Sequence, residues 1–451
     1  MGGSWTTPTT AIIGVARIAS IAGTIWSAAA TASAAMTRSA GGQARIGRSV
    51  GRYDSSMSRS ERADVVIIGG AIVGSSIATF LAMRPDFDGR IIVVERDPSF
   101  RTSSTTLSAA SIRLQFSTPL NIEISRFGVE VIKHPHRFLA VDGQGPEIDF
   151  VENGYLFLAT DAGRATLERN HAVQRALDVP VVLLSPAELA ARFEWMQTDD
   201  LAGGSLGLSD EGWFDAHALL QGFRRKARSL GVEERIGEVV GLDRDGDRMV
   251  GVRLADGSSI RADWVVNAAG PRAANVAAMV GVALPVSPRK RLVYHFEAPI
   301  SLGPAPLTID TSGVYFRPEG PSFIAGFAPR DGFADPDTLD LRVDRAPFES
   351  IVWPALAHRV PGFDRLRLLD AWAGHYEVNT LDHNAVVGPH PTIRNLLFAN
   401  GFSGHGLQQA PAVGRGLAEW VVSGGYETLD LSPLDYARIT RNEPIRELNV
   451  V

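Results

Sequence analysis

The stretch Val65-Val66-Ile67-Ile68-Gly69-Gly70-Ala71-Ile72-Val73-Gly74 decides the fold of this chain. Its four leading apolar residues are typical of a strand buried on both faces of a parallel sheet, and a glycine turn follows at once. Ser75 to Met83 indicates a helix of small and apolar residues, and a second apolar run, Ile91 to Val94, ends in Glu95. This order predicts a dinucleotide-binding βαβ unit.

Each position of the motif has a physical role. Gly69 permits the tight turn, and Gly74 lets the helix pack closely on the strand. A pyrophosphate would lie on the backbone N–H groups at the helix start, and Glu95 would accept hydrogen bonds from ribose hydroxyls. Ala71 departs from the pattern, because the middle glycine of the motif usually stands there. The motif alone leaves open another doubly wound fold, and it does not separate FAD from NAD.

Composition and charge exclude several classes of protein. The 451 residues, with 45% hydrophobic and 21% charged side chains, indicate a globular protein of two or three domains. The chain has 44 basic and 50 acidic residues, a balance that argues against nucleic acid as a partner. The lack of cysteine excludes disulfides, thiolate metal sites and a cysteine-linked cofactor, and no metal-ligand spacing stands out.

Residues 1–61 differ from the rest of the chain and predict a disordered leader. The first 53 residues contain no acid and are rich in Ala, Ser, Thr and Gly. Three interpretations remain open: an organellar transit peptide, a secretory signal ending near Ala32-Ser33-Ala34, or translation that starts at Met57. Ile18 to Thr37 is too weakly apolar to predict a membrane span. We expect a cytoplasmic protein if translation starts near Met57, and a mitochondrial matrix protein if the leader is a transit peptide in a eukaryote.

Later segments supply further parts of the same sheet. Trp213 to Leu230 predicts an amphipathic helix. Predicted strands lie at Glu238–Leu242, Gly251–Leu254 and Leu396–Asn400, and Asp263–Pro271 predicts a buried strand that runs into a glycine turn. The strand at Leu396–Asn400 leads through the glycine-rich stretch Gly401–Leu407 into a helix that ends near Val422.

Three motifs in this order, Asp64–Gly74, Asn267–Pro271 and Gly401–Gln408, resemble the FAD-dependent amine and amino-acid oxidoreductases, the family of D-amino-acid oxidase and sarcosine oxidase. The resemblance covers about residues 62–430. It is closest to the subgroup of the mitochondrial FAD-dependent oxidoreductase linked to complex I assembly, in which Ala is similarly found at the middle glycine. The stretches that carry this closer resemblance are Ser104–Ser108, Ile112–Ser117, Asn379–Asp382, Val386–Pro391 and Gly401–Pro411.

The resemblance implies an α/β (α+β) fold of two domains. A Rossmann-type FAD-binding domain is assembled from the discontinuous segments 62–110, 205–285 and 366–430. A substrate domain built on a mixed sheet takes 111–204 and 286–365, and 431–451 form a C-terminal tail.

The resemblance also assigns residues to FAD. They are Gly69, Ala71, Ile72, Val73, Gly74, Glu95, Arg96, Thr105, Thr106, Ser108, Val239, Ala269, Gly270, Gly401, Ser403, Gly404, His405, Gly406, Leu407 and Gln408. The helix after Gly401–Gly406 would point its N-terminus at the flavin pyrimidine carbonyl. Ser108 stands where related enzymes carry a flavin-linking histidine, and others use a cysteine that this chain lacks. We therefore expect non-covalent FAD.

The substrate site follows from the same resemblance. Arg113 falls at the position that binds a substrate carboxylate, and Gln408 stands where sarcosine oxidase-like enzymes have a second cationic anchor. Ile324 aligns loosely with a lysine that promotes reaction with oxygen, which favours a dehydrogenase. Four further side chains are candidates for the pocket, Tyr315, Arg317, His375 and Tyr376. The tyrosines could instead be core packing, and His405 could serve either catalysis or a structural hydrogen bond.

These residues predict oxidation of the C–N bond of an amino acid or N-substituted amino acid to an imine, by hydride transfer to flavin N5. Oxygen or another electron acceptor would reoxidise the flavin. A flavoprotein acting mainly as an assembly or scaffolding factor for a respiratory complex is the alternative, and a hydroxy-acid dehydrogenase is a third reading. The run Arg289-Lys290-Arg291 is interpreted as a solvated or interdomain charge run.

Overall fold

The computed structural model describes residues 61–329 and 334–448. The predicted leader therefore lies outside the described residues, apart from Glu61. Helices in the described part are α2 (Ile72–Ala82), α3 (Pro119–Lys133), α4 (Pro135–Leu139), α5 (Asp161–Ala176), α6 (Pro186–Arg192), α7 (Ala216–Ser229), α8 (Ala273–Ala278), α9 (Trp353–Arg359), α10 (Gly406–Ser423) and α11 (Ala437–Arg441).

The first sheet is built around β1, the strand that opens the glycine motif. Among the described residues it has eight strands, in the order β17-β18-β11-β1-β2-β8, with the antiparallel pair β9–β10 attached through β10 to β11. β1 is parallel to both β2 and β11. The strands are β1 (Glu61–Ile68), β2 (Ile91–Glu95), β8 (Glu233–Ile236), β9 (Val239–Asp245), β10 (Arg248–Leu254), β11 (Ser259–Asn267), β17 (Val386–Pro389) and β18 (Leu396–Asn400).

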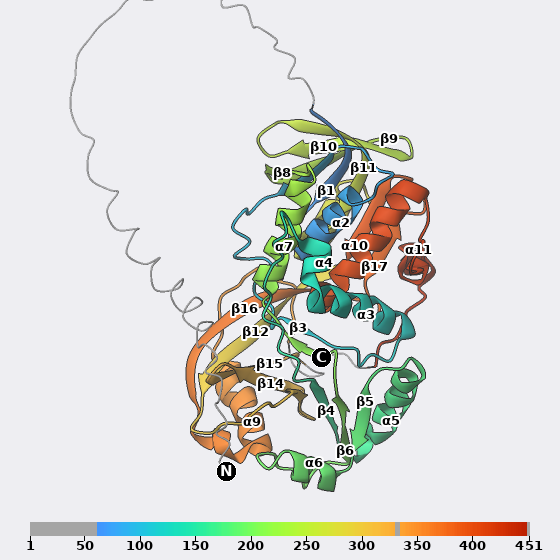
Figure 1. The fold of residues 1–451 in the computed structure, drawn as a ribbon. Coiled ribbons are helices and arrows are strands. Elements are labelled where there is room, and N and C mark those ends of the chain that lie inside the picture. Colours follow the sequence, from blue (N-terminus) through green and yellow to red (C-terminus); the bar gives the residue numbers. More distant parts are fainter. Residues whose placement is uncertain (1–60, 330–333, 449–451) are drawn as a thin grey trace, which may run out of the picture. The chain divides into compact units, whose positions relative to one another are not determined.

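Both faces of β1 are buried, as its all-apolar sequence predicts. Val65 and Ile67 point into a core that they share with α2, α3, α7 and α10. Val66 and Ile68 point to the opposite face, where β9, β10 and α8 cover them. Figure 1 shows α2, α7 and α10 gathered along this sheet. The three-layered arrangement fixes the end of β1, where the glycine turn begins.

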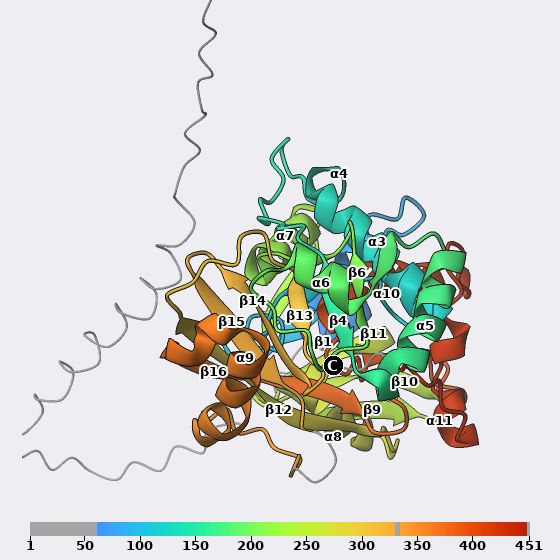
Figure 2. The ribbon, with the colours of Figure 1, turned by 90° about the horizontal axis from the view of Figure 1, so that it is seen from below.

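The second sheet is mixed and carries the other large core. Its eight strands within the described chain run in the order β16-β12-β15-β14-β13-β4-β6-β5. Figure 1 shows α5 beside β5, at one end of this sheet, and α9 beside β14, and Figure 2 gives the view from below. The strands are β4 (Tyr155–Ala159), β5 (Val181–Leu184), β6 (Gly203–Gly207), β12 (Val286–Glu297), β13 (Leu307–Ile309), β14 (Val314–Glu319), β15 (Ser322–Phe327) and β16 (Arg367–Asn379). A short pair, β3 (Ser111–Ile112) with β7 (Gly212–Trp213), lies apart from both sheets.

The fold class expected from the sequence is confirmed, and local boundaries differ in physically simple ways. The helix predicted from Trp213 begins at Ala216, because Trp213 pairs in β7 and the Asp215 side chain caps the helix by accepting from the Ala218 N–H at 2.8 Å. β16 pairs with β12 over its whole length, so the predicted segment 366–430 contributes strands to both sheets. The division into two domains remains a prediction.

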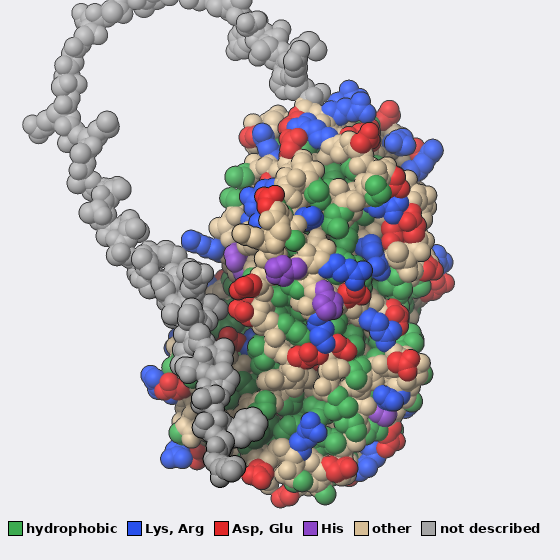
Figure 3. Space-filling model, viewed as in Figure 1, with side chains coloured by type: hydrophobic (Ala, Val, Ile, Leu, Met, Phe, Trp, Pro, Cys, Tyr) green, Lys and Arg blue, Asp and Glu red, His purple; other side chains and the backbone are tan. Residues whose placement is uncertain are grey.

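The described surface carries charges of both signs. On the face shown in Figure 3, Lys and Arg side chains are interspersed with Asp and Glu and do not gather into one basic area. None of the described helices is both long enough and apolar enough to span a bilayer. The described residues also contain no cluster of three or more His, Asp or Glu side chains suited to hold a metal ion.

Candidate FAD and substrate sites

The turn after β1 is so tight that two of its positions admit only glycine. Gly69 has a φ of +103°, and a Cβ there would lie 2.3 Å from the carbonyl oxygen of Ala268 in the loop after β11. A Cβ on Gly74 would lie 1.9 Å from the Gly69 carbonyl oxygen. The predicted roles of these glycines, a tight turn and close packing of helix on strand, agree with this geometry. Ala71 caps α2 with an extended backbone, so its methyl group is accommodated.

Glu95 ends β2 beside this turn. Its carboxylate accepts hydrogen bonds from the N–H groups of Gly70 and Asp97, both at 2.8 Å. A carboxylate offers about four acceptor positions, so the side chain retains capacity for ribose hydroxyls. Thr105 approaches from the next segment and accepts from the Ile72 N–H at 3.3 Å, in the first turn of α2.

A cavity of about 330 Å³ opens at this edge of the first sheet, within the range of roughly 300–1,000 Å³ that is usual for ligand pockets. Segments distant in the sequence form its walls: the β1–α2 turn, residues 94–109, the start of β9, the turn after β11, β16 and the start of α10. Most of the residues assigned to FAD line it, namely Gly69, Ala71, Ile72, Val73, Glu95, Arg96, Thr105, Ser108, Val239, Ala269, Gly270, Gly404, Gly406 and Leu407.

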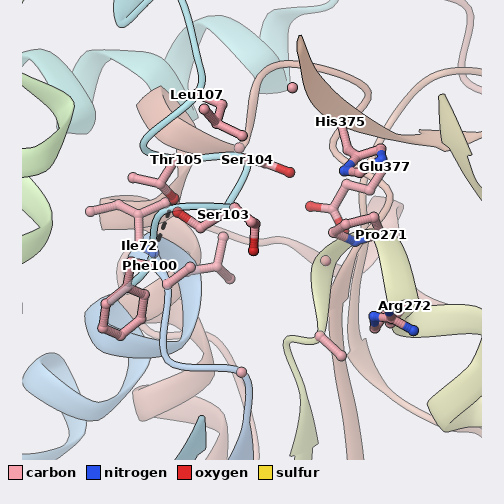
Figure 4. Close-up of a pocket in the computed structure, with 18 of the residues that line it drawn as sticks. Ile72, Phe100, Ser103, Ser104, Thr105, Leu107, Pro271, Arg272, His375 and Glu377 are labelled. Carbon is pink, nitrogen blue, oxygen red and sulfur yellow. Dashed lines mark hydrogen bonds between the residues drawn. The ribbon is translucent and has the colours of Figure 1, made fainter. Parts of the chain in front are cut away.

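Two buried polar side chains of β16 line the cavity. Each has one atom that forms no hydrogen bond with any described residue. They are His375, through Nε2, and Glu377, through Oε2. Figure 4 shows both on one wall, beside Pro271 and Arg272, with Ile72 and Thr105 on the other. Buried polar atoms are rarely left without a partner, so a polar ligand is expected between these walls. The glycine turn, the acid at the end of β2 and these unpaired atoms together suit FAD.

We expect the stability of the folded protein to depend on pH through the buried side chain of Glu377. Burial raises the pKa of its carboxyl to about 8, far above the usual value for a glutamic acid. A raised pKa means that the neutral form stabilises the fold below about pH 4.5 and that this contribution is lost as pH rises toward 8, by about 1.4 kcal/mol per pH unit at the steepest. Glu377→Gln should therefore gain stability relative to the wild type between pH 5 and pH 9 in FAD-free protein, measured as the melting temperature. Glu168→Gln, an exposed change on α5, is the control; a parallel pH profile in Glu377→Gln and wild type would contradict the expectation.

A smaller cavity of about 60 Å³ adjoins the first. The two share four lining residues, Ala109, Tyr315, Tyr376 and Gly404. Arg113, Tyr155, His405 and Gln408 complete the polar lining with Ser111. Burial raises the pKa of Tyr155 to about 12, and raises those of Tyr315 and Tyr376 as well, so all three phenols are neutral at pH 7.

Arg113 supplies the positive charge of the small cavity. The residue is only 3% exposed, and its guanidinium lies 4.1 Å from the ring centre of Phe116. Its Nη1 donates to the Gln115 carbonyl oxygen at 2.5 Å, and its Nη2 lies 3.0 Å from Nε2 of His405. Burial lowers the pKa of Arg113, an effect that the charges of Glu447 and Glu211 oppose. An arginine keeps its charge under such conditions, whereas a lysine would be prone to lose it.

His405 and Gln408 both orient Arg113. A guanidinium can only donate, so Nε2 of His405 must accept, and burial together with the Arg113 charge lowers the pKa of His405 to about 3. His405 is therefore a neutral acceptor at physiological pH. The Gln408 Oε1 accepts from the backbone N–H of Arg113 at 2.8 Å. The contact with Arg113 joins His405 to a residue outside its own turn, and a catalytic role for His405 remains a prediction.

Some predicted residues lie outside both cavities. Gly74, Thr106, Gly401 and Ser403 do not line them, although they belong to the surrounding turns. Arg317 is also outside: it pairs with Glu319, donates to the Ala109 carbonyl oxygen at 3.0 Å and stacks over Trp213. Ile324 is buried within β15 and lines neither cavity.

The run Arg289-Lys290-Arg291, interpreted from the sequence as a solvated or interdomain charge run, is half-buried, and each of its cations has an acidic partner. The partners are three aspartates between residues 335 and 340. Leu339 and Leu341 of the same segment line the larger cavity. The backbone of this segment is attached to β12 as well, where the Thr338 N–H donates to the Pro288 carbonyl oxygen at 2.9 Å. The ion pairs are Arg289–Asp337 at 3.2 Å, Lys290–Asp340 at 3.4 Å and Arg291–Asp335 at 2.7 Å.

Sequence reasoning missed several residues of the small cavity and its surroundings. Ser111 directly precedes the Arg113 motif, so its position could have suggested it. Tyr155 hydrogen-bonds to Ser111 from β4, and Glu211 and Glu447 reach the same region from two other segments. No local pattern marks these three side chains, because long-range pairing alone brings them here.

Comparison with known proteins agrees with this geometry. The sequence profile of the family described as FAD dependent oxidoreductase matches residues 64–420. The chain is 42% identical over 426 residues to FAD-dependent oxidoreductase domain-containing protein 1 of Xenopus laevis, covering 87% of this chain and 85% of that protein. It is 28% identical over 388 residues to glycine oxidase of Geobacillus kaustophilus, covering 84% and 98%. The crystal structure of L-proline dehydrogenase from P. horikoshii superposes with a TM-score of 0.75 at 28% identity, covering 86% of this chain and 100% of that one.

The family match over residues 64–420 therefore includes the glycine turn after β1, the acid at the end of β2 and the residues that line the cavity between them. The chain belongs to the family of FAD dependent oxidoreductases.

Proposed function

We propose that this protein oxidises the C–N bond of a small amino acid or N-substituted amino acid, with FAD in the larger cavity and the amine in the smaller one. The observation that carries the proposal is the buried guanidinium of Arg113 in a small, tyrosine-lined cavity adjoining the candidate FAD site. A planar guanidinium recognises a carboxylate through two parallel hydrogen bonds.

The residues of the small cavity have distinct tasks in this proposal. Arg113 binds the substrate carboxylate, and His405 and Gln408 hold Arg113 in place. The rings of Tyr155, Tyr315 and Tyr376 exclude water and orient the amine toward the shared wall of the two cavities. Bound FAD would supply the acceptor of the hydride equivalent. The N-terminus of α10, with its partial positive charge, lies where the cavities meet and suits an anionic reduced ring.

Relatives support the substrate class. Two of the similar proteins are named for oxidation of glycine and dehydrogenation of L-proline, which are small carboxylated amines. We favour a dehydrogenase over an oxidase, because no lysine is among the described residues that line the two cavities. The assembly-factor alternative finds no specific support in the cavities.

Anaerobic mixing of the purified holoenzyme with a panel of N-methyl and D-amino acids, glycine and L-proline tests the proposal. Loss of the oxidised flavin absorbance with one of them supports it, and slow recovery in air supports the dehydrogenase assignment. A flavin that no carboxylated amine reduces would favour the assembly-factor alternative.

FAD should be held non-covalently. The Ser108 hydroxyl donates to the Thr105 carbonyl oxygen at 2.8 Å and accepts from the Ala110 N–H, so it serves the turn. After acid precipitation we expect the yellow colour in the supernatant. Colour that stays in the protein pellet would show a covalent link.

A further inference from the structure

The segment that follows Arg113, residues 114–118, has an unusual set of backbone partners. It joins β3 to α3 and belongs to neither sheet nor helix, so its N–H groups need other acceptors. Leu114 and Gln115 donate to Oε1 of Glu211, at 2.7 and 3.0 Å. Ser117 and Thr118 donate to the two carboxylate oxygens of Glu447, at 2.7 and 3.1 Å.

Side chains reinforce both attachments. The Gln115 Nε2 donates to Oε2 of Glu211 at 2.9 Å. The Ser117 hydroxyl donates to Oε1 of Glu447 at 2.7 Å, and the Asn121 Nδ2 donates to Oε2 at 3.3 Å. Phe116, in the middle, donates its N–H to the Leu114 carbonyl oxygen at 2.8 Å. Every backbone N–H from 114 to 118 is therefore paired, and the two carboxylates take four of the five.

Both carboxylates are buried, and they come from distant parts of the chain. Glu211 is 0% exposed and precedes β7, whereas Glu447 is 8% exposed and follows α11. Burying an ionised carboxylate is costly unless a cation or several donors compensate it. Burial raises the pKa of Glu211 to about 7, and the hydrogen bonds from Gln115 and Leu114 together with the Arg113 charge oppose that rise. Arg113 is thus such a cation, since the charges of Glu211 and Glu447 in turn favour its protonated form.

The segment that carries Glu447 is itself fastened to the body of the protein. Arg438 forms a buried ion pair with Asp382, and the Ile445 N–H donates to the same carboxylate at 2.7 Å. The Asn384 Nδ2 donates to the Ile445 carbonyl oxygen at 2.6 Å. This segment lies beyond the family match, which ends at residue 420.

We propose that Glu211 and Glu447 form a carboxylate clamp that positions Arg113 to receive the carboxylate of the substrate, so that the C-terminal segment is a working part of the amine site. The clamp deepens the proposed function and rests on its assignment of Arg113. Glu211 and Glu447 are positioning residues, since they act through the segment 113–118 and not on the reacting atoms. A purely structural role would require only hydrogen-bond acceptors, whereas a clamp on Arg113 also requires their negative charge.

Two matched probes separate these roles in the FAD-bound protein. Pyrrole-2-carboxylate has a carboxylate beside a ring nitrogen and no oxidisable C–H at the intervening carbon, and pyrrole-2-carboxamide has the same shape without the charge. Binding of each is measured from the change in flavin absorbance at about pH 8.5, above the raised pKa of Glu211, so that its carboxyl is ionised in the wild type. Glu447→Gln and Glu211→Gln should each raise the Kd of the carboxylate about tenfold, the scale of one weakened charge-assisted hydrogen bond, and change that of the carboxamide less than about twofold. Glu443→Gln, on the exposed pair with Arg441, is the control and should leave both unchanged.

The outcomes are distinguishable. A variant that loses affinity for both probes equally and also loses FAD would show a structural role and overturn the clamp. Unchanged binding of the carboxylate in both variants would overturn it as well. A wild type that binds the carboxylate no better than the carboxamide would overturn both the clamp and the role of Arg113. Selective loss of carboxylate binding in a protein whose flavin no amine reduces would support the clamp and reject the proposed function. Amide exchange of the core strands β1 and β11 confirms that each variant is folded.

Discussion

Replacing Arg113 by Ala should raise the KM for a carboxylated amine about 100-fold while FAD remains bound, because a charge-assisted hydrogen-bonded pair with the substrate is lost. Arg113 lines the small cavity and not the larger one, so its removal leaves the candidate FAD contacts in place. The effect should fall on KM more than on kcat, since the carboxylate is remote from the bond that breaks.

A second variant separates the loss of carboxylate recognition from a general loss of stability. Arg113→Ala leaves the buried carboxylates of Glu211 and Glu447 without the guanidinium charge that acts on them, whereas Arg113→Lys retains a hydrogen-bond donor that can be protonated and loses the planar fork. We expect Arg113→Lys to show an intermediate KM with little loss of melting temperature. Arg164→Ala, an exposed change on α5, serves as the control. An unchanged KM in both Arg113 variants would refute carboxylate recognition by this residue.

Gly74→Ala should abolish retention of FAD during purification. The new Cβ would lie 1.9 Å from the Gly69 carbonyl oxygen and 3.2 Å from the Ile67 side chain, so α2 must move away from β1. Gly69 cannot yield, because its own position lies against the Ala268 carbonyl oxygen. We expect a colourless protein that is destabilised by about 2 kcal/mol, which is usual for overpacking in a core.

Gly425→Ala is the matched control, since a Cβ there would meet nothing within 4 Å. FAD content is read from the ratio of flavin to protein absorbance, and stability from thermal unfolding. If Gly74→Ala retained FAD at the wild-type ratio, the turn after β1 would not be the cofactor site that we assign.

The parts of the fold that follow from contiguous sequence were predicted well. Strand, glycine turn, helix and second strand lie within residues 65–95, where apolar runs and glycines decide the local structure. The rest of the FAD cavity could be predicted only from three motifs, taken in their order, that are spread over most of the chain. Their placement together is a property of the sheet order β18-β11-β1-β2 and not of any one segment.

The small cavity marks the limit of prediction. Tyr315 and Arg317 are two residues apart on β14 and point to the same face, yet only Tyr315 reaches the cavity, because Arg317 is engaged by Glu319 and Ala109. Tyr155, Glu211 and Glu447 carry no local signature. Their roles arise from contacts with the segment 111–118 made from at least about 40 residues away in the chain, which periodicity cannot reveal.

The most direct test of carboxylate recognition by Arg113 compares amines that differ only in their carboxylate. The rate of anaerobic flavin reduction is measured with N-methylglycine against dimethylamine and with L-proline against pyrrolidine, each over a range of concentrations. We expect at least one carboxylated amine to reduce the flavin and its counterpart without a carboxylate to do so far more slowly. This difference in rate should disappear in Arg113→Ala. Equal reduction by both members of each pair, or reduction by neither, would contradict this expectation.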